Sequence, residues 1–182
     1  MPLIKRGRPV SDPFVQVADD VALPAEGPII VGLARWQEER GLIEPRNAPV
    51  GVRLRPGEPV EQISGNLDRL SVVALEFPKF NDGRAMSQAR LLRERYGYKG
   101  EIRAVGKVVR DLLLFMHRCG FDAFEVADDV TAGVVENALG EFSVFYQPAA
   151  EGGPGLVERR HGRTVPGEAS PPEIDRTATF CE

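Results

Sequence analysis

One stretch constrains the fold most strongly: an apolar run that enters a polar turn and leaves it as a patterned helix. The run is Val72-Val73-Ala74-Leu75, and Pro78 ends the strand because proline has no N–H to donate. Asn81-Asp82-Gly83 has turn chemistry, and Asp82 is a candidate N-cap for a helix over 84–96. The helix repeats apolar residues with a core-facing period: Ala85, Ala89, Leu92 and Tyr96. The sequence predicts strand, turn and helix in succession, a layout that can surround an anion with N–H groups and basic side chains.

The same alternation of apolar runs and helical segments continues along much of the chain. Strands are predicted over 29–33, 50–54, 72–77, 102–105, 121–126 and 142–146. Helices are predicted over 34–40, 59–70, 84–96, 107–118 and 128–139. This order predicts an α/β fold, a mostly parallel sheet of about six strands with helices on both faces. The alternative is an incomplete (β/α) barrel, which we rank second because about six strands fall short of a closed eightfold barrel.

Three segments follow from the composition. Residues 1–27 form an N-terminal extension in which Val15-Gln16-Val17 is a candidate edge strand or hairpin arm. Residues 28–148 form the α/β domain. Residues 149–182 are rich in Gly and Pro among charges and have no apolar period, so we expect a mobile tail.

Composition bounds the class of protein. The fractions of 42% hydrophobic and 27% charged residues are ordinary for a soluble globular protein. No apolar run is long enough to cross a membrane, and Met1-Pro2-Leu3-Ile4 lacks the core of a secretory signal, so we expect a cytoplasmic protein. The spacing of the two cysteines, Cys119 and Cys181, and of the two histidines provides no metal-site pattern.

Charge is unevenly spread along the sequence. The net charge is −4, yet the segment 79–107 holds eight basic and three acidic residues. A basic segment in an acidic protein favours a localised anionic ligand or partner over general nucleic-acid affinity. The competing interpretation is a solvated helix face.

The candidate site residues lie where predicted strands end, because ligands of parallel α/β sheets bind at the carboxyl ends of the strands. They form a predicted anion- or partner-binding rim: Lys79, Asn81, Asp82, Gly83, Arg84, Arg53, Arg103 and Lys107. Guanidinium groups bind oxyanions in bidentate fashion, and the predicted helices at Arg84 and Lys107 each begin beside a glycine. The plain alternatives are that Asp82 only caps a helix and that Arg103 pairs with Glu101 or Glu76.

No motif names a reaction or a cofactor. Neither the phosphate loop GxxxxGK[ST] nor the dinucleotide fingerprint GxGxxG occurs. Ser87 has no neighbouring histidine and lies within a predicted helix, so no nucleophile can be assigned and the catalytic residues are unknown.

Four segments together resemble a known bacterial family: 77–84 (FPKFNDGR), 87–93 (SQARLLR), 100–106 (GEIRAVG) and 118–124 (RCGFDAF). The family consists of uncharacterised proteins labelled probable oxidoreductases and encoded beside assimilatory sulfite reductase. The resemblance covers about residues 28–148 and implies an accessory role in reductive sulfur assimilation. No flavin, haem or iron–sulfur motif in the chain supports the oxidoreductase label.

Three functions remain open at this point. The first is an accessory protein of assimilatory sulfite reduction whose basic rim engages a small anion or an acidic partner such as the sulfite reductase. The second is an enzyme acting on a phosphorylated or sulfated small molecule. The third is a structural module that forms homo-oligomers, with its arginines as solvated surface.

Overall fold

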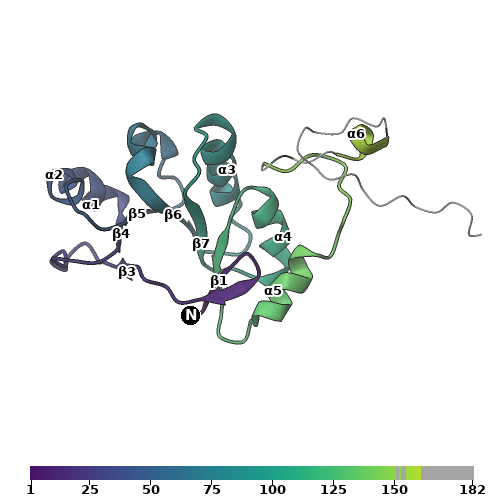
Figure 1. The fold of residues 1–182 in the computed structure, drawn as a ribbon, viewed down its shortest axis with the longest axis horizontal. Helices are drawn as coiled ribbons and strands as arrows, with labels where there is room; N and C mark the ends of the chain where they lie inside the picture. The colour runs from purple at the N-terminus through teal and green to yellow at the C-terminus, as the bar shows by residue number, and fades with distance from the viewer. Residues whose placement is uncertain (151, 153–154, 161–182) are drawn as a thin grey trace, which may run out of the picture. The chain divides into compact units, whose positions relative to one another are not determined.

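A computed structural model describes residues 1–150, 152 and 155–160 (Figure 1). The chain divides into two compact units, of which the first comprises Met1–Ser143 with Ala149–Glu151. The second comprises Val144–Pro148 with Gly152–Glu182, and its described part contains one short helix, α6 (Leu156–Arg160). Most of the tail predicted to be mobile, residues 151, 153–154 and 161–182, lies outside the described residues.

The first unit is built on one eight-stranded sheet with the order β2-β1-β8-β7-β6-β5-β4-β3. The strands are β1 (Leu3–Lys5), β2 (Arg8–Val10), β3 (Val15–Gln16), β4 (Ile29–Gly32), β5 (Val50–Leu54), β6 (Leu70–Phe77), β7 (Glu101–Gly106) and β8 (Ala123–Glu125). From β3 to β8 neighbouring strands are parallel, whereas β1 is antiparallel to both of its neighbours. The predicted α/β class with a mostly parallel sheet is therefore confirmed.

The membership of the sheet differs from the prediction at both ends of the chain. The segment 1–27 contributes three strands, and Val15 and Gln16 form the predicted edge strand beside β4. The strand expected over 142–146 is wrong, since those residues form bends and irregular backbone.

The helical segments are shorter than their apolar patterns suggested. They are α1 (Leu33–Glu38), α2 (Arg40–Ile43), η1 (Val60–Gln62), η2 (Ser64–Arg69), α3 (Arg84–Arg90), η3 (Leu91–Arg95), α4 (Arg110–Arg118) and α5 (Ala132–Leu139). Two 3-10 turns replace the helix predicted over 59–70, where Gly65 and its polar neighbours are poor helix formers. The element η3 is a π-helical turn that continues α3.

The helices α1, α3, α4 and α5 pack against one face of the sheet (Figure 1). Alternate residues of each strand point to this face because side chains of a strand alternate between its two sides. The resulting core is closely filled and includes Trp36, Leu75, Phe77, Met116 and Phe121. Burial of these side chains is the main stabilising contribution to the fold.

The opposite face is concave and is crossed by the N-terminal segment rather than by helices. Residues 11–14 connect β2 at one edge of the sheet to β3 at the other. Val10 and Val15 are five residues apart, so the chain between them spans at most about 18 Å. A flat sheet of this width would separate its edge strands by roughly 34 Å, at about 4.8 Å per strand. The sheet is therefore curled into an incomplete barrel, which is the alternative predicted architecture, and the expected helices on both faces are replaced by helices on the convex face alone.

Gly51 allows this curl on the concave side of β5. A Cβ atom at Gly51 would lie 2.9 Å from Ile30 Cγ1 and 3.1 Å from the Val72 carbonyl oxygen. The register between β5 and β6 also shifts between Val50 and Gly51. A side chain at this position would hold the neighbouring strands apart and flatten the sheet.

Candidate functional site

Four adjacent strands place charged side chains on the concave face, and β7 contributes two, Glu101 and Arg103. Arg53 of β5, Glu76 of β6, Arg103 of β7 and Glu125 of β8 stand among apolar residues, and their signs alternate across the sheet. Because Arg53 and Arg103 both lie beside Ala74 while Glu76 and Glu125 lie two residues further along their strands, the charges form a zigzag. Opposite charges thus face one another inside the incomplete barrel.

Arg103 is the buried centre of this arrangement, with 1% of its surface exposed. Its guanidinium group lies 2.6 Å from Asp12 Oδ2, 2.9 Å from Glu101 Oε1 and 3.6 Å from Glu125 Oε1. Phe14 stacks beneath it, with the ring centroid 5.6 Å from Arg103 Cζ. Arg103 therefore fastens the N-terminal segment to the sheet and is not available to an external anion, although its predicted pairing with Glu101 is confirmed.

Burial of Glu125 changes its acidity. Desolvation raises the pKa of this carboxyl group, and the nearby Arg103 opposes the shift. Gln16 Nε2 donates to Glu125 Oε1 at 3.4 Å, which links β3 to β8 across the interior.

Arg53 and Glu76 lie nearer the carboxyl ends of their strands and remain partly open to solvent. The Nε and Nη2 atoms of Arg53 each lie 3.2 Å from Glu76 Oε2, and Arg53 Nη1 donates to Gln16 Oε1 at 2.9 Å. These three side chains form the floor of a cleft of about 600 Å³.

The cleft opens between the segment after β3 and the ends of β4, β5 and β6. Its polar lining residues are Gln16, Asp19, Asp20, Arg53, Arg55, Glu58 and Glu76. Arg55 and Asp19 face each other at 4.0 Å, the limit of an ion pair. Gly32 makes room for Asp19, because a Cβ atom on Gly32 would lie 3.2 Å from Asp19 Oδ1. A cleft at the carboxyl end of a parallel sheet is where such folds bind ligands.

The remaining predicted residues lie on the loops that follow β6 and β7. Lys79, Asn81 and Gly83 are exposed in the turn after β6, and Lys107 is exposed directly after β7. The N–H of Lys107 donates to the Phe77 carbonyl oxygen at 2.7 Å, so the two loops adjoin. We call Lys79, Arg84 and Lys107 the basic rim.

Phe80 projects from the centre of the turn after β6, with 64% of its surface exposed. The turn is closed by a hydrogen bond of 3.2 Å from the Asp82 N–H to the Lys79 carbonyl oxygen. Neither Lys79 nor Lys107 forms an ion pair with any residue that the structure describes.

Asp82, which is partly buried, and the exposed Arg84 form a close pair at the start of α3. Arg84 Nη2 lies 2.6 Å from Asp82 Oδ2, and the Arg84 N–H donates to Asp82 Oδ1 at 3.2 Å. The side-chain hydrogen bond from Arg84 lowers the pKa of Asp82 to about 2. The N-cap of α3 is Gly83 and has no side-chain cap, so the prediction of Asp82 at that position is wrong by one residue.

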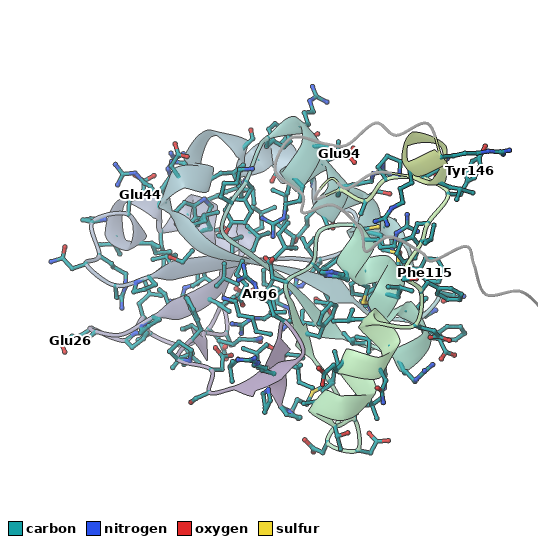
Figure 2. The ribbon with its side chains drawn as sticks, turned by 45° about the vertical axis from the view of Figure 1, so that its right-hand side comes forward. Arg6, Glu26, Glu44, Glu94, Phe115 and Tyr146 are labelled. Carbon is teal, nitrogen blue, oxygen red and sulfur yellow. The ribbon has the colours of Figure 1, made fainter. Side chains whose placement is uncertain are left out.

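The helix expected to begin at Lys107 begins at Arg110. Gly106 has a φ of +94° and Val109 is extended, which keeps residues 106–109 out of the helix. Lys107 therefore stands on a loop and not at a helix N-terminus. Phe115 projects from the exposed side of α4, and Glu94 from the helical turn that continues α3 (Figure 2).

The structure divides the predicted site into two places. Lys79, Asn81, Asp82, Gly83, Arg84 and Lys107 share the loops after β6 and β7, whereas Arg53 lies on the cleft floor and Arg103 is buried behind it. Sequence reasoning missed Asp12, Gln16 and Asp19 as parts of the concave face. The signal that was available is the presence of charged residues in four otherwise apolar strands, which indicates a polar interior. Nothing local in the sequence indicates that residues 12–19 cross the concave face of the sheet.

Comparison with known sequences gives a family but no activity. The family described as "Bacterial protein of unknown function (DUF934)" matches residues 51–156. The chain belongs to this family. No curated protein matches the chain. The matched segment contains β5 to β8 and the basic rim, while the strands β1 to β4 and one wall of the cleft lie outside it.

Two classes of feature are not found in the described part of the chain. No group of three or more His, Cys, Asp and Glu side chains there is arranged to hold a metal ion. No described helix is long and apolar enough to span a membrane.

Proposed function

We propose that this protein is an accessory of assimilatory sulfite reduction and that its basic rim docks on an acidic surface of the sulfite reductase. The pathway comes from the resemblance of about residues 28–148 to proteins encoded beside that enzyme. The observation that carries the docking role is the pair Lys79 and Lys107, which lie on adjoining loops, exposed and without an ion-pair partner among the described residues.

The composition of the rim favours a protein partner over a small ion. Phe80 stands exposed beside the lysines, and an aromatic anchor ringed by charges is typical of protein interfaces. Exposed cations on both loops would steer an acidic partner and make the association sensitive to salt. The alternative of an enzyme acting on a phosphorylated or sulfated molecule lacks a comparable observation at the rim.

The direct test is binding of the purified protein to purified sulfite reductase at low and high ionic strength. We expect binding that weakens as salt rises, and a further loss of about tenfold or more in the Lys79→Glu/Lys107→Glu variant. Lys99→Glu is the matched control, because Lys99 is exposed at the opposite end of β7. Binding that is equally strong in the double variant would overturn the docking role.

The pathway itself is tested by deleting the gene and growing the cells on sulfate, sulfite or cysteine as sulfur source. We expect poor growth on sulfate and sulfite with rescue by cysteine. Normal growth on all three sources would remove the assignment to sulfite reduction whatever the binding experiment shows.

A further inference from the structure

The cleft on the concave face is separate from the basic rim. Its lining comes from residues 16–20, from residues 30–34 and from Arg53, Arg55, Glu58 and Glu76. None of Lys79, Arg84 and Lys107 lines it. Docking of a partner on the rim therefore leaves the cleft without a role.

The floor and the wall of the cleft each carry an ion pair that solvent can reach. The side chains of Arg53 and Glu76 are 33% and 22% exposed, and those of Arg55 and Asp19 are 69% and 57% exposed. The contact of 4.0 Å between Arg55 and Asp19 is too long for a hydrogen bond, so both groups keep donors and acceptors for another molecule.

The lining also constrains the charge of a ligand. Two arginines stand among four carboxylates, those of Asp19, Asp20, Glu58 and Glu76. A ligand with negative charge alone would be repelled by the surplus of carboxylates. A ligand with positive charge alone would be repelled by both guanidinium groups. A molecule that carries both charges can pair its negative group with an arginine and its positive group with a carboxylate.

We propose that the cleft binds a zwitterionic small molecule of amino-acid to dipeptide size. Arg55 receives the ligand carboxylate in a bidentate contact, and Asp19 receives its ammonium group, so that the ligand replaces the long contact between these two residues. A cleft of about 600 Å³ lies within the ordinary range for small-molecule sites. The partly exposed Arg53–Glu76 pair on the floor offers further polar contacts to the remainder of the ligand.

The test uses three small probes that differ in charge: glycylglycine, its N-acetyl derivative and its C-terminal amide. Chemical-shift changes in the full chain, followed at millimolar probe concentrations, report binding and its location. We expect glycylglycine to shift the amides of residues 16–20 and 30–34, with about tenfold weaker binding of either singly charged derivative. Equal binding of the three probes, or no binding of glycylglycine, overturns the proposal.

Two variants connect binding to the named residues. Arg55→Gln and Asp19→Asn change exposed side chains and leave the core intact, so each is expected to weaken glycylglycine binding by about tenfold while the fold persists. Arg69→Gln and Asp68→Asn are matched controls, since both residues are exposed at the amino end of β6. Unchanged binding in Arg55→Gln would contradict the proposal. The Lys79→Glu/Lys107→Glu variant should bind glycylglycine normally, which separates this site from the docking surface.

Discussion

Arg103 is almost fully buried, and three carboxylates and an aromatic ring surround its guanidinium group. Burial of such a charge costs free energy. Removal of the charge alone costs more, because its buried partners are then left unpaired. Glu101 has a second cation, Lys5, at 2.6 Å, but among the described residues Asp12 pairs only with Arg103. Arg103 is thus a structural residue of the concave face, and sequence reasoning that placed it at the binding rim mistook a buried charge for an exposed one.

Replacing Arg103 with methionine tests this role. We expect Arg103→Met to lower the free energy of unfolding by about 3–5 kcal/mol, because it leaves partly buried carboxylates without their cationic partner. Urea denaturation measures the change. The control is Arg90→Met, which removes an exposed pair between Arg90 of α3 and Glu94 of η3 and should cost less than about 1 kcal/mol. A loss in Arg103→Met as small as in the control would show that the network adds little to stability.

Asp82 gives a prediction about how the stability of the fold depends on pH. Its pKa is lowered from 3.8 to about 2, so ionised Asp82 favours the folded state above the unfolded pKa. This contribution is complete above about pH 4 and is lost as pH falls through the folded pKa. Titration by NMR should show the Asp82 carboxyl with a midpoint near 2, and Arg84→Gln should move that midpoint up toward 3.8. An unchanged midpoint in Arg84→Gln would mean that another group causes the shift.

At the scale of elements, the strands were easier to predict than the helices. The apolar runs of β4 to β8 are short and bounded by Gly, Pro or charged residues, so each one was found from sequence. Residues 60–69 and 107–109 have apolar spacing that fits a helix, yet the first segment forms 3-10 turns and the second forms a bend and irregular backbone. Local pattern does not fix the backbone at Gly106, where a positive φ and a close approach to β6 decide the conformation.

Gly106 ends β7 next to the carboxyl end of β6, and this element boundary can be tested. A Cβ atom there would lie 2.5 Å from the Phe77 carbonyl oxygen, and the φ of +94° disfavours every other residue type. We expect Gly106→Ala to destabilise the protein by about 1–3 kcal/mol in thermal or urea unfolding. Gly83→Ala is the control, because no atom lies within 4 Å of a Cβ placed there and its φ is negative. Equal stability of the two variants would show that the loop after β7 adapts freely.

At the scale of the first unit, curvature of the sheet is the property that sequence could not supply. The predicted strands favoured an open sheet and left an incomplete barrel as the alternative, because strand order and curl depend on contacts between distant segments. The decisive contacts are those of Asp12 and Phe14 with β7, and of Gln16 with β5 and β8. These residues lie in the segment 1–27, which was predicted as an N-terminal extension with a candidate edge strand or hairpin arm and not as a segment that crosses the sheet. The cleft, which that segment borders, could not be predicted for the same reason.

Phe14 provides a test of how the segment is held. It packs against Ile30, Val72, Ala74 and Val105 on the concave face. In Phe14→Ala we expect hydrogen exchange to accelerate by about tenfold or more at the Val15 and Val17 amides, which donate to the Pro28 and Ile30 carbonyl oxygens. Amides of β6 and β7 should keep their protection. Phe115→Ala, which alters an exposed residue of α4, is the control and should leave the exchange of β3 unchanged.

The pairing of β1 with β8 has a consequence for synthesis on the ribosome. Leu3 lies opposite Val10 of β2 on one side and Glu125 of β8 on the other, so β1 can pair with β2 early but lacks its second neighbour until β8 has left the exit tunnel. Contacts between segments so far apart in sequence form late, since a long chain must be closed before they add any stability. Nascent chains released before β8 has emerged would therefore present β1 and its apolar residues to chaperones.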